Sequence, residues 1–337
     1  MKKTWKFGMG SALAALLLAG CGDTAEEPET TEEEVTEEEV ADEEVAEETP
    51  AEEQPEAVAF PLTVTDAAGN EMTIEEEPES IVSLMPSNTE ILFELGLGDR
   101  VVGVTDFDTY PEEVADIEKV GGVEFNVEKI ISLAPDVVLA HESAVATGAA
   151  GYQQLRDAGI PVYVVSDATT FDEVYASIEE IGEVTGAAAE ADGIITSMQE
   201  EVAAIEEQAA EVEEPKDVFV EIAGAPDIYT AGSGTLIDEM IEVINAENVA
   251  AELEGWPNVD PEQIVEWNPD VILTTYGAFT PDAVEQVLAR EGFGDVTAVA
   301  EEAVYDVDGN VVTRPGPRLT EGLELMAEAV YPEVFSE

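Results

Sequence analysis

Two stretches of this chain repeat one pattern of helix and strand signals. Residues 126–140 read NVEKIISLAPDVVLA, and residues 260–274 read DPEQIVEWNPDVILT. Each stretch begins with a helix-capping residue, Asn126 or Asp260, and a glutamate follows two positions later. A proline then ends the short helix before an apolar run that suits a buried strand. The shared order of Glu, Ile, Pro, Asp and Val predicts two similar α/β lobes that face each other.

Apolar runs rich in Val and Ile alternate with helical stretches through the folded part of the chain. Such alternation is typical of parallel sheets that are covered by helices. The predicted strands are 81–84, 101–104, 137–140, 162–165, 218–222 and 271–275.

One long helix is predicted between the fourth and fifth of these strands. Residues 187–213 contain no proline, and apolar residues recur there at helical spacing. We expect this helix to join an N-terminal lobe at 58–186 to a C-terminal lobe at 214–337, each with a central parallel sheet flanked by helices.

The first twenty residues have the layout of an export signal, with lysines followed by an apolar run that is too short to span a bilayer. Cys21 is the only cysteine and directly follows Leu18-Ala19-Gly20, which resembles the lipobox of bacterial lipoproteins. In that motif the cysteine is lipidated after residues 1–20 are removed. Residues 21–57 are acidic and contain no basic residue, so they predict a disordered tether. The expected location is the outer face of the cell membrane, where the lipid on Cys21 anchors the protein.

The charge balance excludes several kinds of partner. The chain has 79 Asp and Glu against 11 Lys and Arg, a formal net charge of −68. Three of the lysines lie in the predicted signal, which leaves eight basic residues. Nucleic acid is therefore not expected to bind, and the acidic surface suits a salty medium that screens self-repulsion. A site for a bare transition-metal ion is disfavoured because His141 is the only histidine.

The chain resembles the substrate-binding proteins of iron-siderophore and vitamin B12 ABC importers over nearly all of its folded part. The similar segments are IVSLMPSNTEILFELGLGDRVVGVTDFDTYP at 81–111, FNVEKIISLAPDVVLA at 125–140, the repeated unit at 260–274 and RPGPR at 314–318. The resemblance implies two lobes joined by one rigid helix, with a ligand held in the cleft between them. It also implies a monomer that hands a small-molecule metal chelate to a permease and ATPase complex, uses no cofactor of its own and catalyses no reaction.

Two glutamates are the expected contacts with the permease. In the family one acidic residue on each lobe meets permease arginines, and the matching positions are Glu128 and Glu262. Each falls at the second position of its predicted helix, where a side chain should point outward. The alternative is that both only stabilise the helix dipole, but a two-fold permease would need one equivalent contact per lobe.

Parallel α/β lobes bind ligands at the carboxyl ends of their strands, which points to Phe107, His141 and Tyr276. By resemblance, aromatic side chains lie against the corrin at Phe107, His141, Tyr229 and Trp256. The alternative for these aromatics is packing within a lobe. Of the two arginines in RPGPR, one is expected to face the ligand and the other to hold the last helix against a carboxylate. The candidate ligand-binding residues are Phe107, His141, Tyr229, Trp256, Tyr276 and Arg314.

Two local motifs have simpler interpretations. Ser87-Asn88-Thr89-Glu90 has the form of a helix capping box, which accounts for Glu90. The DVDGN sequence at 306–310 lacks the full spacing of a calcium loop, so a hairpin turn is predicted there.

Ligand identity stays open among metal chelates. A largely neutral corrinoid such as cobalamin fits a base-poor aromatic cleft best, a neutral ferric hydroxamate siderophore is second, and haem is third because no tyrosine matches in the first lobe. Two other classes remain at this point. One is an extracytoplasmic enzyme that uses two carboxylates, and the other is a sensor or adhesin lipoprotein without a permease.

Overall fold

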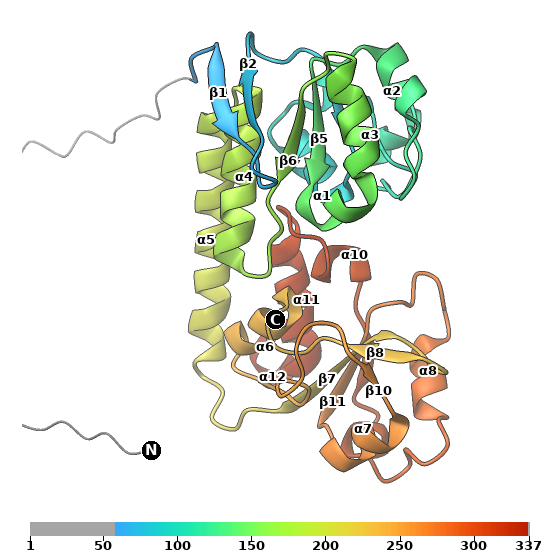
Figure 1. Cartoon of the computed structure of the whole chain (residues 1–337). Helices are drawn as coiled ribbons and strands as arrows, with labels where there is room; N and C mark the ends of the chain where they lie inside the picture. The colour runs from blue at the N-terminus through green and yellow to red at the C-terminus, as the bar shows by residue number, and fades with distance from the viewer. Residues whose placement is uncertain (1–57, 336–337) are drawn as a thin grey trace, which may run out of the picture. The chain divides into compact units, whose positions relative to one another are not determined.

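The computed structural model describes residues 58–335 (Figure 1). The predicted signal at 1–20, the lipidation site Cys21 and the tether at 21–57 lie outside the described residues. Within the described part, no helix combines the length and the apolar character needed to cross a bilayer.

The N-terminal lobe is built on a parallel four-stranded sheet with the order β4-β3-β5-β6. A separate antiparallel hairpin, β1-β2, precedes it. The strands are β1 (Leu62–Thr65), β2 (Glu71–Ile74), β3 (Ile81–Ser83), β4 (Val101–Gly103), β5 (Val137–His141) and β6 (Val162–Val165). The helices are α1 (Pro86–Glu94), α2 (Val127–Leu133), α3 (Val145–Asp157) and α4 (Phe171–Thr185), with short 3-10 turns η1 (Gly98–Arg100), η2 (Glu112–Asp116) and η3 (Glu142–Ala144).

The C-terminal lobe has a mixed sheet with the order β10-β8-β7-β11-β12, and β9 also pairs with β7. The central strands β7, β11 and β12 are parallel, whereas β8 pairs antiparallel with both β7 and β10. Neither β8 nor β10 was predicted from the sequence. The strands are β7 (Asp217–Ala223), β8 (Ile228–Thr230), β9 (Glu247–Asn248), β10 (Asn258–Val259), β11 (Val271–Thr274) and β12 (Val304–Asp306). The helices are α6 (Leu236–Val243), α7 (Pro261–Trp267), α8 (Ala283–Leu288), α9 (Thr297–Ala300), α10 (Gly309–Val312), α11 (Leu319–Val330) and α12 (Pro332–Phe335).

A long helix, α5 (Ala188–Ala209), connects the lobes. Its 22 residues span about 33 Å. The helix was expected to continue to residue 213, but it ends at Ala209 because the chain turns at 210–212. It packs against α4 of the first lobe and α11 of the second, as Figure 1 shows. The predicted α/β architecture of two similar lobes with a joining helix is confirmed.

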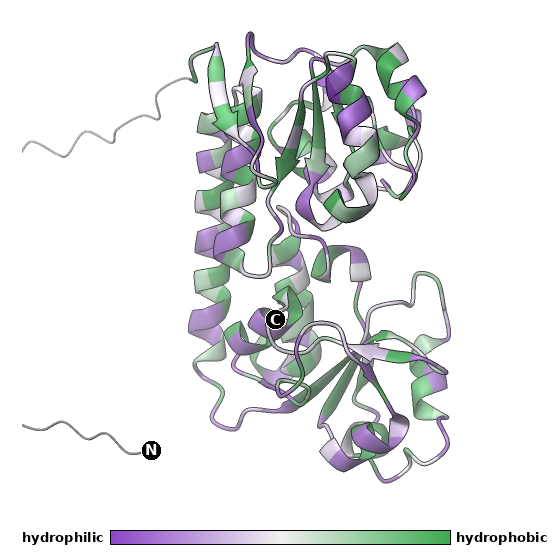
Figure 2. Ribbon diagram, viewed as in Figure 1, coloured by the Kyte–Doolittle hydropathy of each residue, from purple (hydrophilic) through white to green (hydrophobic). Residues whose placement is uncertain are grey.

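The apolar core continues from one lobe to the other. One buried cluster runs from Ile81 and Ile178 in the first lobe past Met198 on α5 to Met240 and Leu323 in the second. Two smaller clusters lie between the sheet of each lobe and helices of the same lobe. The strands of both sheets are largely hydrophobic in Figure 2. Because the main cluster crosses the junction, moving one lobe against the other would disturb packed core side chains.

The repeated segments 126–140 and 260–274 have the same backbone conformation and hydrogen bonds at the ends of their helices. Both α2 and α7 end at a left-handed residue, Ala134 (φ 48°) or Asn268 (φ 51°). Two residues later an aspartate accepts a backbone N–H at the start of the neighbouring strand: Asp136 from Ser80, just before β3, at 2.9 Å and Asp270 from Asp217, the first residue of β7, at 3.0 Å. The two lobes therefore share hydrogen bonds as well as sequence.

Three local predictions need correction. Asp260 makes no side-chain cap, although Asn126 accepts from the N–H of Lys129; α7 instead begins with Pro261, whose missing N–H needs no cap. The predicted capping box at 87–90 lies inside α1, which begins at Pro86. The DVDGN sequence forms no hairpin, because the Asp308 side chain accepts from the N–H of Asn310 and starts α10.

Equivalent isoleucines anchor the repeated helices, and both are fully buried: Ile130 in α2 and Ile264 in α7. We expect Ile130→Ala and Ile264→Ala each to lower the free energy of unfolding by about 2 to 5 kcal/mol, since each removes buried methyl groups and leaves a cavity. Urea unfolding in high salt measures this. Ile131→Ala, at the exposed neighbouring position, is the control and should change it by less than about 1 kcal/mol; equal effects at both positions would contradict the anchoring role.

Candidate functional site

The carboxyl ends of the strands in both lobes are hollowed. In the first lobe a pocket of about 230 Å³ lies beyond β3, β4 and β5, and its lining includes Met85, Phe107 and Tyr152. Phe107 is 53% exposed, and its ring covers Gly122, where a Cβ atom would come within 3.0 Å of the ring. The backbone at Gly122 thus serves as a platform that directs Phe107 into the pocket.

The second lobe has a matching pocket of about 210 Å³ beyond β11 and β12, lined by residues that include Tyr276 and Phe279. Phe279 is 87% exposed. Its loop is held by Asp306, which accepts the N–H of Gly277 at 3.0 Å and the hydroxyl of Thr274 at 2.5 Å. A Cβ atom on Gly277 would lie 1.9 Å from the Asp306 carboxylate, so a side chain there would displace the carboxylate that holds the loop.

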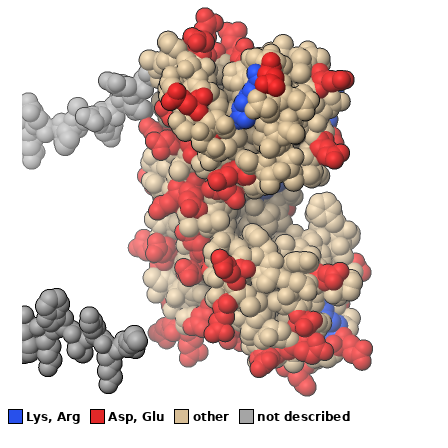
Figure 3. Space-filling model, viewed as in Figure 1, with Lys and Arg blue, Asp and Glu red and all other residues tan. Residues whose placement is uncertain are grey.

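A third pocket, of about 120 Å³, is lined by both lobes. Asp167 and Thr169 come from the first lobe, and Trp256, Thr313 and Pro315 from the second. Trp256 is 51% exposed. Figure 3 shows the hollow between the two halves of the molecule. The three pockets together mark a cleft with exposed aromatic side chains on both sides.

Of the predicted ligand residues, Phe107, Trp256 and Tyr276 line these pockets. Tyr229 is 42% exposed on β8 but lines none of them. Phe279, which also lines the second-lobe pocket, was not predicted from the sequence. Its place three residues after Tyr276, in the loop that follows β11, could have indicated a ligand-binding role.

His141 lies at the carboxyl end of β5 as expected, but its side chain is buried, with 4% of the residue exposed. Its Nδ1 is 2.9 Å from the hydroxyl of Ser143 and accepts from the N–H of Ser143 at 3.3 Å. Its Nε2 is 4.0 Å from Asp167. Burial lowers the pKa of His141, and Asp167, Glu142 and Glu180 oppose this shift only in part. In this geometry the ring supports the cleft wall and does not face the cleft.

Tyr276 is oriented by a buried carboxylate. Glu221 is fully buried, receives two hydrogen bonds of 2.7 Å from Arg290, and accepts the Tyr276 hydroxyl at 2.5 Å. Burial, followed by the bond to Glu221, raises the pKa of Tyr276 above its ordinary value. The phenol therefore stays protonated and presents its ring to the pocket.

Arg314 does not reach into the cleft as a free ligand contact. Its Nη1 donates to Glu90 at 2.7 Å, while Arg318 makes a two-pronged contact with the same carboxylate at 2.9 and 2.8 Å. Glu90 is 3% exposed on α1. Both arginines thus hold the second lobe against the first, and Glu90 is their shared partner, which corrects its interpretation as a cap.

The same arginines support the loop that carries Phe107. Arg314 Nη2 lies 3.4 Å from the carbonyl oxygen of Phe107 and 3.4 Å from the hydroxyl of Thr109. The guanidinium of Arg318 lies 3.9 Å from the ring centre of Tyr110, a cation–π contact. The interlobe ion cluster therefore also positions the first-lobe wall of the cleft.

Every basic residue in the described part of the chain is already engaged. Seven form ion pairs with carboxylates, and the eighth, Lys119, donates to the carbonyl oxygen of Asp108 at 3.1 Å. The seven are Arg100, Lys129, Arg156, Lys216, Arg290, Arg314 and Arg318. The pockets of the cleft are lined by aromatic, aliphatic and hydroxyl side chains together with the carboxylates of Asp167 and Asp308. Among residues 58–335 no cluster of free cations faces them.

Residues 81–311 match the model of a family described as periplasmic binding protein. The chain belongs to this family. It is 47% identical, over the full length of both chains, to a Bacillus subtilis protein named "Uncharacterized ABC transporter substrate-binding lipoprotein YvrC". It is 34% identical to a cobalamin-binding protein of Halobacterium salinarum, with 82% of this chain and 75% of that protein aligned.

A solved structure with the same fold is also similar to this chain in sequence. It is a possible iron-binding (periplasmic solute-binding) protein of Staphylococcus epidermidis, 35% identical, with a TM-score of 0.70 over 76% of this chain and 100% of that one. Periplasmic binding proteins bind solutes, and this agrees with the expectation of binding without catalysis.

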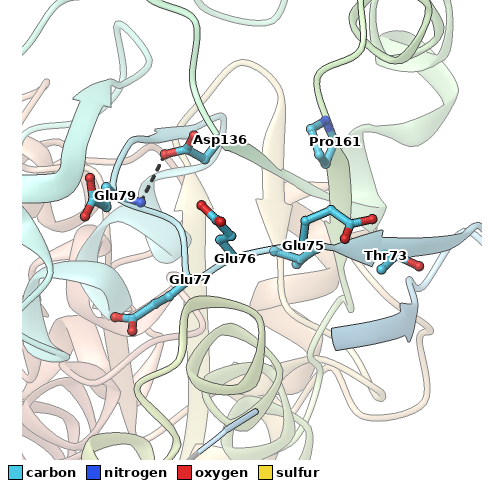
Figure 4. A pocket seen from close by; sticks show the side chains of 8 residues that line it. Thr73, Glu75, Glu76, Glu77, Glu79, Asp136 and Pro161 are labelled. Carbon is cyan, nitrogen blue, oxygen red and sulfur yellow. Dashed lines mark hydrogen bonds between the residues drawn. The ribbon is translucent and has the colours of Figure 1, made fainter. Parts of the chain in front are cut away.

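A pocket larger than those of the cleft lies elsewhere in this periplasmic binding protein. A pocket of about 550 Å³ is lined by Glu75, Glu76, Glu77, Glu79 and Asp136 (Figure 4). Asp136 accepts the N–H of Glu79 at 3.0 Å, as drawn there. These residues precede β3 and β5, so the hollow is at the opposite end of the sheet from the cleft. Its carboxylates repel one another and keep it hydrated. Among residues 58–335, no group of three or more metal-binding side chains is gathered.

The interlobe carboxylate is expected to be costly to remove. Glu90→Gln leaves two largely buried guanidinium groups without a counter-charge, so we expect the free energy of unfolding to fall by about 3 kcal/mol or more. Thermal and urea unfolding measure it. Glu94→Gln, at the exposed end of the same helix, is the matched control and should change it by less than about 0.5 kcal/mol. A loss no larger than the control's would show that the cluster does not stabilise the fold.

His141 should make stability depend on pH. Its pKa is lowered in the folded state, so the unfolded chain takes up the proton first as pH falls through the ordinary value of 6.5. The stability due to neutral His141 is therefore present above this pH and lost below it. We expect the difference in unfolding free energy between wild type and His141→Gln to shrink between pH 7.5 and pH 5, since the carboxylates are common to both. A pH-independent difference would exclude this role.

Proposed function

We propose that this chain is the extracytoplasmic solute-binding subunit of an ABC importer, and that its cargo is a cobalt corrinoid such as cobalamin. The observation that carries the proposal is the cleft, which presents Phe107 from one lobe and Trp256 and Phe279 from the other, each more than half exposed. Large aromatic side chains left exposed at a concave site are suited to a bulky ligand with an extended apolar face.

The electrostatics of the cleft favour a ligand with little net negative charge. Recognition of a ferric triscatecholate would call for several convergent cations, whereas the basic residues of the described part already contact carboxylates or a backbone carbonyl. A corrinoid offers a broad ring for stacking and amide groups for hydrogen bonds with hydroxyl and backbone groups. The 34% identical cobalamin-binding protein of Halobacterium salinarum supports the same choice.

A neutral ferric hydroxamate is the second candidate cargo. It could occupy the same aromatic, base-poor cleft, and the Staphylococcus epidermidis structure, described as a possible iron-binding protein, favours it. Haem ranks third, because His141 is buried and the pKa of Tyr276 is raised by burial and Glu221, which disfavours the phenolate that would ligate iron.

Delivery in this proposal uses the two repeated helices. Glu128 and Glu262 are exposed at the second positions of α2 and α7, one on each lobe. They would meet basic residues of a permease that works with an ATPase. The Bacillus subtilis relative, named as an ABC transporter substrate-binding lipoprotein, supports such a partner and a lipid anchor on Cys21 at the outer face of the membrane.

The test is calorimetric titration of the full chain in detergent with cyanocobalamin and, separately, with a ferric hydroxamate, both in high salt. We expect cyanocobalamin to bind at micromolar or lower concentration and Trp256→Ala to weaken it about tenfold by loss of a stacking contact. Trp267→Phe is the control, because Trp267 packs against Phe219 within α7's lobe. Binding of the hydroxamate alone would assign the protein to iron uptake, and binding of neither would refute the proposal.

A further inference from the structure

The helices α2 and α7 expose the same positions in the same order. Along Val127–Leu133 and Pro261–Trp267, the sequence of buried, half-buried and exposed residues is identical at all seven positions. The central isoleucine of each is fully buried, and the next residue is an exposed aliphatic one: Ile131 is 41% exposed and Val265 is 39% exposed.

The exposure of Ile131 and Val265 to solvent is not explained by the fold. Among the large apolar side chains exposed in residues 58–335, the aliphatic ones are Val123, Ile131 and Val265. Val123 lines the first-lobe pocket, so the remaining two occupy equivalent places in the two copies of the repeat. β-branched residues are also weaker helix formers than the charged residues that dominate this chain. Neither helix propensity nor core packing explains them.

Each aliphatic side chain has an acidic neighbour on its own helix. Ile131 follows Glu128 by three residues, and Val265 follows Glu262 by three residues. Residues three apart lie on the same face of an α-helix. Each lobe therefore presents one carboxylate beside one aliphatic group. The helices that carry them, α2 and α7, lie on the side of each lobe away from α5 in Figure 1.

We propose that Ile131 and Val265 are the apolar halves of two equivalent docking contacts with a two-fold symmetric membrane partner, the permease of the importer proposed above. Each half of that partner would offer a basic side chain to the glutamate and an apolar patch to the aliphatic side chain next to it. The inference rests on the proposed function for the partner's identity, and it adds the chemistry of the contact.

The charge of the chain explains why an apolar component is useful. An ion pair between exposed groups weakens as salt screens it, and a formal net charge of −68 suits a salty medium. Burial of aliphatic surface is not screened, and several salts strengthen it. Ile131 and Val265 would thus maintain docking under conditions in which Glu128 and Glu262 contribute little.

The experiment measures docking apart from cargo binding. Proteoliposomes that contain the cognate permease and ATPase complex are titrated with the cyanocobalamin-loaded full chain, and the concentration that half-maximally stimulates ATP hydrolysis is recorded. We expect Ile131→Ser and Val265→Ser to raise it about threefold each, and the double variant about tenfold, in 0.1 M and in 1 M KCl. The Glu128→Gln and Glu262→Gln pair should raise it in 0.1 M KCl and much less in 1 M KCl.

Matched substitutions on the same helices provide the control. Ser132→Asn and Glu266→Gln change the next exposed position of α2 and α7 and should leave the titration unchanged. Cyanocobalamin affinity and thermal unfolding should be unaltered in every variant, since none of these side chains is buried. If wild type stimulates hydrolysis but the Ser double variant matches it, or if only one lobe matters, the docking inference alone is overturned. If wild type neither binds cyanocobalamin nor stimulates hydrolysis, the proposed function is refuted and the inference with it.

Discussion

The carboxylate of Glu90 holds together the parts of this protein that form the cleft. It is nearly inaccessible to water and receives three hydrogen bonds from Arg314 and Arg318. One end of this cluster is on α1, in the first lobe, and the other is at the start of α11, in the second. A charge buried in this way is tolerable only with its counter-charges in place, so the cluster sets one arrangement of the lobes. Through Arg314 and Arg318 it also supports the loop with Phe107 and Tyr110.

The apolar core reinforces this arrangement. Buried side chains continue along α4 and α5 into α6 and α11 without a break at the junction, and polar contacts accompany them. Glu239 on α6 accepts the N–H of Phe171 at 2.6 Å, and Glu201 on α5 accepts the hydroxyl of Thr320 at 2.5 Å. A cleft whose walls are already fixed loses less conformational entropy when a bulky ligand binds. The continuous core and these polar contacts therefore oppose movement of one lobe against the other.

Basic residues are scarce in this chain, and most of them stabilise the fold. Of the eight basic residues in the described part, four pair with buried carboxylates, those of Glu90, Glu221 and Asp66. Three more form surface pairs. Glu221 in turn orients Tyr276 at the second-lobe pocket. Cations that stabilise the fold are thus not free to recognise an anionic ligand, which connects the composition of the chain to the chemistry of its cleft.

The sequence by itself determined the repeated units, six central strands and the joining helix. These depend on local signals that can be read within about 15 residues: a capping residue or proline, an apolar period and a helix stop. The burial of Ile130 and Ile264 and the exposure of Glu128 and Glu262 follow from the same helical period.

Only the tertiary structure decided which charged groups meet and which aromatic side chains face the cleft. Glu90 and Arg318 are 228 residues apart, and nothing in the local pattern of α1 distinguishes a cap from a buried ion-pair partner. The strands β8 and β10, which pair antiparallel beside β7, are only three and two residues long, too short to show a period. The burial of His141 and the exposure of Phe279 likewise depend on how neighbouring strands and loops stack, because side-chain accessibility is a property of packing between distant segments and not of the local sequence.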